Sequence, residues 1–178
     1  MNLSPNFTLD ELTHTDHRDL DNTPNDAELE NLVRLAEFLE QVKEVLGGKP
    51  IIVNSAFRSK AVNDAVGSKD SSQHRRGCAA DIRVPGMKPD EVVRAIIEAK
   101  LAYDQVIREF DRWTHVSIPS NIGDKPREMA LIIDKSGTRM FAQSAKKFRK
   151  ANRHPIAMIA PANKTAMVIK TSIFCTSP

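Results

Sequence analysis

Between residues 24 and 46, apolar residues recur every three or four positions, which is the period of a helix with one buried face. The apolar positions on this stripe are Leu29, Leu32, Val33, Ala36, Leu39 and Val42. Thr23 followed by Pro24 is typical of an N-cap with a proline in the first turn, and Gly47 with Gly48 suits the helix end. The pattern predicts a long amphipathic helix that serves as a scaffold.

Shorter segments after this helix have the patterns of strands and short helices. The segments expected to form strands are rich in β-branched and other apolar residues, and they are 51–55, 79–84, 106–110, 113–118 and 129–134. Short helices are expected near 59–65 and 89–99. Because helices come first and strands follow without regular βα alternation, the sequence predicts an α+β domain with a small, mainly antiparallel sheet flanked by helices.

Two of these strands each place one polar side chain on the face opposite their apolar residues. Alternation along 79–84 sends Asp81 to the face opposite its apolar neighbours, and along 113–118 it does the same for His115. Imidazole nitrogen and carboxylate oxygen bind Zn²⁺ at about 2.0–2.2 Å, and a catalytic zinc site has three protein ligands and one open position. Together with His74, which lies just before the first of these strands, the two residues would supply such a set.

Several separated motifs resemble those of one peptidase family. Residues 72–81 fit the S-x-H-x-x-G-x-A-x-D signature of the M15-type zinc peptidases, and 113–117 are similar to their second motif, W-x-H. The stretch 55–67 resembles the segment that precedes these motifs in phage and bacterial members. The resemblance, over roughly residues 7–141, implies a hedgehog/DD-peptidase-like fold and a zinc D,D-carboxypeptidase or L,D-endopeptidase that cleaves peptidoglycan stem peptides.

The resemblance also implies roles for individual residues. It gives as zinc ligands His74, Asp81 and His115. Many relatives have an acidic residue three positions before the second histidine, where this chain has Arg112. Others have a glutamate six positions before it, which indicates Glu109 as the general base and leaves Asp111 as the alternative. Arg58 matches the family's arginine and is expected to bind the substrate carboxylate or the tetrahedral intermediate.

Residues beside the motifs allow two interpretations each. Trp113 either lines the substrate groove or packs in the core. Ser72 and Gln73 either contact substrate or make local hydrogen bonds in their loop. Cys78 lies between a glycine and two alanines, so we expect a buried packing thiol, and its distance from Cys175 in a chain without secretion signals argues against a disulfide.

The charge is unevenly distributed along the chain. Residues 1–141 carry 19 Lys and Arg against 23 Asp and Glu, a net charge of −4, whereas 142–178 carry seven basic residues and no acidic one, a net charge of +7. We therefore expect a zinc peptidase domain over 1–141 and a basic C-terminal extension over 142–178. An anionic surface is a suitable partner for the extension, although a solvated face explains its charge as well. No specific nucleic acid partner is expected.

The N-terminus has no cationic segment followed by an apolar core, and no later run reaches the roughly 18 apolar residues that span a bilayer. We expect a chain made in the cytoplasm without a signal peptide, which acts on the cell wall after release or as a virion component, as a phage endolysin does. The alternative function is a non-catalytic, zinc-stabilised binding or structural module of a phage particle. Nucleic-acid binding by the basic extension is a third hypothesis, and it predicts salt-sensitive binding.

Overall fold

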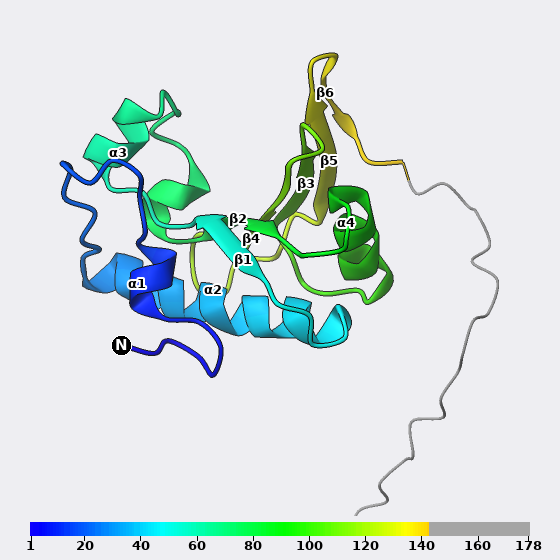
Figure 1. The fold of residues 1–178 in the computed structure, drawn as a ribbon, viewed down its shortest axis with the longest axis horizontal. Helices are drawn as coiled ribbons and strands as arrows, with labels where there is room; N and C mark the ends of the chain where they lie inside the picture. The colour runs from blue at the N-terminus through cyan, green and yellow to red at the C-terminus, as the bar shows by residue number, and fades with distance from the viewer. Residues whose placement is uncertain (143–178) are drawn as a thin grey trace, which may run out of the picture. The chain divides into compact units, whose positions relative to one another are not determined.

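The order of helices and strands follows the sequence patterns closely. The structure is a computed structural model that describes residues 1–142 (Figure 1). Its elements are α1 (Leu9–Leu12), α2 (Asp26–Val45), β1 (Ile52–Ser55), α3 (Lys60–Ala65), the 3₁₀ helix η1 (Gln73–Arg76), β2 (Ala79–Arg83), α4 (Pro89–Glu98), β3 (Gln105–Glu109), β4 (Trp113–Ser117), β5 (Met129–Asp134) and β6 (Gly137–Met140). The predicted helices and strands are confirmed. The sequence patterns missed α1, η1 and β6, because the first two are single turns and β6 is exposed along its whole length.

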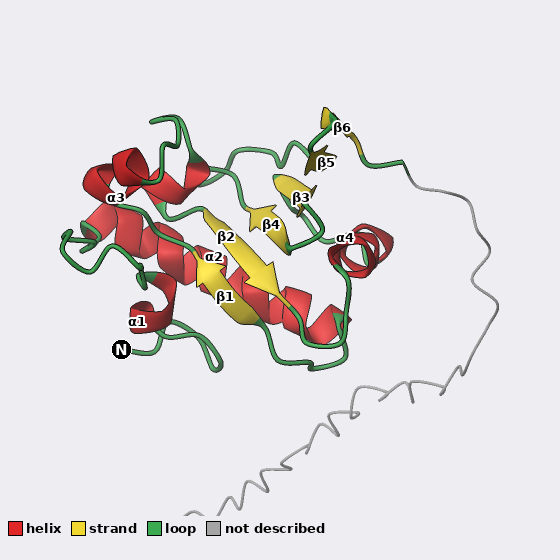
Figure 2. Cartoon of the chain, turned by 45° about the horizontal axis from the view of Figure 1, so that its top comes forward, coloured by secondary structure: helices red, strands yellow, loops and turns green. Residues whose placement is uncertain are grey.

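All six strands of the described region belong to one sheet, in the order β1-β2-β4-β3-β5-β6 (Figure 2). Four neighbouring pairs are antiparallel, and β3 and β5 run parallel. The α+β class and the mainly antiparallel sheet are therefore confirmed, with one parallel pair that the sequence did not indicate. That pair arises because the connection 118–128 returns the chain to the start of β3 instead of turning β5 back against β4.

The N-cap of α2 differs from the predicted one. Asn25 caps the helix in a capping box: its side chain accepts from the amide of Glu28 at 3.0 Å, and the Glu28 carboxylate accepts from the amide of Asn25 at 2.9 Å. Thr23 instead donates its hydroxyl to the carboxylate of Asp21. The helix therefore begins one residue after Asn25, and the Thr23–Pro24 assignment was wrong.

The hydrophobic core lies on one face of the sheet, between the strands and the helices α2 and α4 (Figure 2). Ala80, Ile82 and Val116 contribute to it from β2 and β4. The buried residues of α2 are Leu32, Leu35, Ala36, Phe38, Leu39 and Val42. Since side chains alternate along a strand, the odd-numbered residues of β2 and β4 point to the opposite face of the sheet.

Three further expectations concern membrane spans, the C-terminal extension and the type of fold. None of the helices within residues 1–142 has the length and apolar character needed to cross a bilayer. The basic extension predicted for 142–178 lies, apart from its first residue, outside the described residues. The hedgehog/DD-peptidase-like arrangement of the fold stays a prediction.

Candidate metal centre

His74 is brought to the sheet by a tight turn that only glycine allows. The residue lies in η1, and Gly77 ends that helix with a φ of 68°, in the left-handed region. A Cβ on Gly77 would lie 2.7 Å from the backbone oxygen of Glu28 in α2. The chain can therefore pass from η1 into β2 close against α2, and the small residues noted in the sequence have a direct structural reason.

Asp81 and His115 are direct neighbours across two strands. They are Cα partners in the antiparallel pair of β2 and β4, so their side chains leave the same face of the sheet next to each other. Their apolar neighbours Ala80 and Val116 pack in the core on the other face. The alternation read from the sequence is confirmed, and the register adds what alternation alone could not, namely that the two residues are opposite each other.

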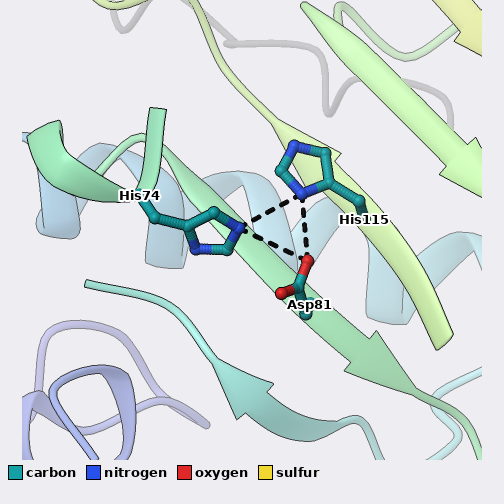
Figure 3. Close-up of side chains that lie close together, drawn as sticks. All are labelled: His74, Asp81 and His115. Atoms are coloured by element: carbon teal, nitrogen blue, oxygen red, sulfur yellow. Dashed lines mark hydrogen bonds and ion pairs between the residues drawn. The ribbon is translucent and has the colours of Figure 1, made fainter. Parts of the chain in front are cut away.

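Three candidate ligand atoms form a nearly equilateral triangle (Figure 3). His115 Nδ1 lies 3.0 Å from Asp81 Oδ1 and 3.2 Å from His74 Nε2, and His74 Nε2 lies 3.4 Å from Asp81 Oδ1. Atoms bound to one tetrahedral zinc ion at about 2.0–2.1 Å lie about 3.3–3.4 Å apart. The observed separations are close to that value, and the donor set of two imidazoles and one carboxylate suits zinc.

The remaining polar atoms of two ligands are held by the segment that follows β1. His74 Nδ1 lies 2.6 Å from the carbonyl oxygen of Ala56. A carbonyl can only accept, so Nδ1 carries the proton and Nε2 presents its lone pair to the triangle. Arg58 donates to Asp81 Oδ2 at 2.8 Å and to the hydroxyl of Ser55 at 2.9 Å. Such outer contacts orient metal ligands in proteins.

Burial and charge favour the protonation states in which these side chains can bind a metal ion. The three residues are all buried, with 4% of His74, 7% of Asp81 and 8% of His115 exposed. Burial lowers the pKa of His74, so its imidazole is kept neutral. Burial alone would raise the pKa of Asp81, but the attraction to His74 and His115, which acts when these imidazoles carry a proton toward the carboxylate, outweighs burial and holds the pKa of Asp81 well below the usual range. Three electron-rich atoms facing one another at this separation require a cation or protons between them.

Glu109 lies on the same face of the sheet as the triangle. It is the Cα partner of Trp113, and the indole Nε1 of Trp113 donates to Glu109 Oε2 at 2.9 Å. Burial raises the pKa of Glu109, and the negative charge of Asp81 raises it further. Asp111, the alternative base, is instead bound by Arg108 and its pKa is lowered, mainly by that hydrogen bond. None of the contacts of Asp111 in the described region reaches the three ligands.

Within the described region, the side-chain contacts of the other predicted site residues do not involve the three ligand atoms. Gln73 donates its amide to Asp104 at 2.9 Å and to the carbonyl of Ile118 at 3.0 Å, which favours the interpretation of local hydrogen bonding. Ser72 is the N-cap of η1 but makes no side-chain capping bond. Arg112 is exposed beside Trp113. Substrate contacts by Ser72, Gln73 and Trp113 stay predictions.

No sequence pattern indicated that a buried carboxylate near η1 forms an ion pair with an arginine. Asp104 is 4% exposed and accepts hydrogen bonds from the guanidinium of Arg127 and from Gln73, the residue before His74. A single acidic residue ahead of a strand has no pattern that would indicate this role. The contact of His74 with the Ala56 carbonyl could not be predicted either, because every residue type has a backbone carbonyl. Cys78, by contrast, is the buried packing thiol that was expected, and burial raises its pKa to about 11.

Comparison with known proteins assigns the chain to a family. The model of the family described as Peptidase M15 matches residues 5–117, which is more than half of the chain and includes all three candidate ligands. The matched region ends with β4, so β5 and β6 lie beyond it. A search of curated proteins found no match. With the buried His-Asp-His group that could hold a metal ion, the match shows that the chain belongs to the peptidase M15 family and is a metallopeptidase.

Proposed function

We propose that this metallopeptidase uses zinc to hydrolyse an amide bond in the stem peptides of peptidoglycan, with Glu109 as the general base. The observation that carries the proposal is the placement of Glu109 on the same face of the sheet as three ligand atoms that lie 3.0–3.4 Å apart. Both a D,D-carboxypeptidase and an L,D-endopeptidase are compatible with this arrangement.

The chemistry divides between the metal and the chain. Zinc in such a site supplies a Lewis acid for the scissile carbonyl and acidifies a water molecule. Glu109 is proposed to accept the proton of the attacking water and to return it to the leaving amine. The hydrogen bond from Trp113 to Oε2 holds this carboxylate in place, and its raised pKa favours taking up a proton and giving it back.

Arg58 has two roles in this proposal. Its bond to Asp81 Oδ2 keeps the other carboxylate oxygen of Asp81 turned toward the histidines, which is a positioning role. The guanidinium has five N–H donors, and the described bonds to Asp81 and Ser55 use two of its nitrogen atoms. The remaining donors are proposed to bind the substrate carboxylate or the tetrahedral intermediate.

The test compares zinc content and product release on purified peptidoglycan. Mass spectrometry of the released fragments identifies the bond that is cut. Glu109→Gln is expected to keep stoichiometric zinc and to lose activity by roughly 10²- to 10⁴-fold, the range for a general base. Glu98→Gln, at the exposed end of α4, is the isosteric control and is expected to keep full activity.

A different result would favour the alternative function. If the unmodified protein binds zinc and releases no fragments from peptidoglycan, the domain is a non-catalytic, zinc-stabilised binding or structural module. If Glu109→Gln is fully active, the general base is another residue, and Asp111→Asn is the next variant to measure.

The proposed setting of the reaction rests on the sequence resemblance and on the uneven charge along the chain. We propose that residues 1–141 form the catalytic domain and that 142–178 are a basic extension suited to an anionic surface. An endolysin-like enzyme would reach the wall after release from the cell or as part of a virion. Loss of binding to anionic wall polymer on deletion of 142–178, at unchanged activity on small stem peptides, would support the role given to the extension.

A further inference from the structure

The turn between β3 and β4 has an unusual backbone. Its two central residues, Phe110 and Asp111, have φ angles of 49° and 55°, and the amide of Arg112 donates to the carbonyl of Glu109 at 2.9 Å. Two successive positive φ angles are those of a type I′ hairpin turn, for which Asn-Gly is strongly preferred. A bulky aromatic residue is unfavourable there, because its Cβ crowds the backbone.

Burial of the Phe110 ring in the core does not offset this strain. Phe110 is 46% exposed and is not among the residues of the core cluster. Strained residues that are kept at the edge of a catalytic site are commonly part of its function. Phe110 directly follows Glu109, the proposed base, at the end of β3.

A cavity of about 720 Å³ lies between this turn and the turn that joins β5 to β6. Phe110 and Trp113 supply its aromatic lining, and residues 134–136 line the opposite side. Its volume is in the range of small-molecule and peptide sites. Since Trp113 also donates to Glu109, the cavity adjoins the proposed base through one side chain.

The charged residues of the lining leave a positive face. The carboxylates of Asp111 and Asp134 are each bound by an arginine of their own hairpin. Arg112 and Lys135 are exposed, and no carboxylate of residues 1–142 forms an ion pair with either. A ligand with both an aliphatic part and a free carboxylate would complement such a surface.

We propose that this cavity binds an acidic peptide segment of the substrate, with Phe110 as its apolar wall and Arg112 and Lys135 as donors to the carboxylate. Phe110 is then a substrate-binding residue. That the peptide is a peptidoglycan stem peptide rests on the proposed function. That the ligand is acidic and partly aliphatic follows from the lining itself.

Binding can be measured with the tryptophan of the cavity. Trp113 is the only tryptophan of the chain, so its fluorescence reports on this place alone. The zinc-loaded Glu109→Gln protein is titrated with a synthetic stem peptide that has free carboxylates and with the same peptide amidated. The free-carboxylate peptide is expected to bind about tenfold more tightly, and the double change Arg112→Gln, Lys135→Gln is expected to remove that difference.

Phe110→Gly tests the apolar wall without adding backbone strain. The variant is expected to weaken binding about tenfold or more, while Phe110→Tyr keeps affinity within about twofold. In the otherwise unmodified enzyme, Phe110→Gly should raise KM and change kcat little, with zinc content unchanged. Lys100→Gly is the matched control: Lys100 is exposed after α4 with a φ of 56°, and this variant should leave binding and kinetics unaltered.

The outcomes separate this inference from the proposed function. Equal affinity of the two peptides, or unchanged binding and KM in a folded Phe110→Gly protein, would overturn the inference even if peptidoglycan is cleaved. If peptidoglycan is not cleaved but the acidic peptide binds and Phe110→Gly weakens its binding, the cavity assignment stands and the catalytic proposal fails. Near-ultraviolet circular dichroism and zinc content establish that each variant is folded.

Discussion

Gly77→Ala tests whether the turn before β2 is what positions His74. The substitution has two costs that the structure separates. An alanine at a φ of 68° costs about 1–2 kcal/mol for the left-handed conformation. Its Cβ would also lie 2.7 Å from the Glu28 carbonyl oxygen and 3.1 Å from Leu32 Cγ, so η1 or α2 must shift, which adds about 1–3 kcal/mol. The expected loss in the free energy of unfolding is about 2–5 kcal/mol, the sum of these estimates.

Two other glycines provide the control for the conformational cost. Gly47 and Gly67 have φ angles of 71° and 70°, and a Cβ on either would meet nothing within 4 Å. Their alanine variants should therefore lose only about 1–2 kcal/mol. Urea unfolding of metal-free protein measures all three. Zinc affinity, from competition with a chelator, should fall for Gly77→Ala alone. If Gly77→Ala matches the two controls in both measurements, close packing of the turn against α2 does not position His74.

Three further predictions concern contacts that orient or stabilise the site. Arg58→Gln is expected to lower zinc affinity about 10- to 100-fold, because Asp81 loses a partner that orients it, and chelator competition checks this; unchanged zinc affinity with a large loss of kcat would indicate a substrate role alone. Asp104→Asn should reduce the free energy of unfolding at pH 7 by about 1–3 kcal/mol, since it weakens a charged contact with the half-exposed Arg127. Burial alone would raise the pKa of Asp104, but its bonds to Arg127 and Gln73 outweigh burial and lower its pKa from the ordinary value of 3.8. The stabilisation is therefore present above the ordinary pKa and is lost as the pH falls through the lowered pKa. A stability difference between the two proteins that persists in acid would contradict this reasoning. Asn25→Ala should cost about 1 kcal/mol in urea unfolding and Thr23→Ala much less, and equal losses would argue against the capping box.

Part of the candidate site could be predicted because it depends on local pattern. Alternation along β2 and β4 places Asp81 and His115 on the faces opposite their apolar neighbours, whatever the rest of the chain does. The chemistry of imidazole and carboxylate then indicates a metal. The family motifs could be found in the same way, since they depend on residue types at set spacings. The helix periods likewise predicted α2 and α4 within two residues of their bounds.

The rest depended on contacts between distant segments, and only the tertiary structure decided them. The Ala56 carbonyl at His74 is 18 residues away in the chain, and Arg58 is 23 residues from Asp81. Neither the strand register nor the burial that shifts the pKa of Glu109 can be calculated without knowing which segments pack together. Alternation determines which face a side chain takes, whereas the distance to its partner is set by how the sheet, η1 and α2 are packed against one another.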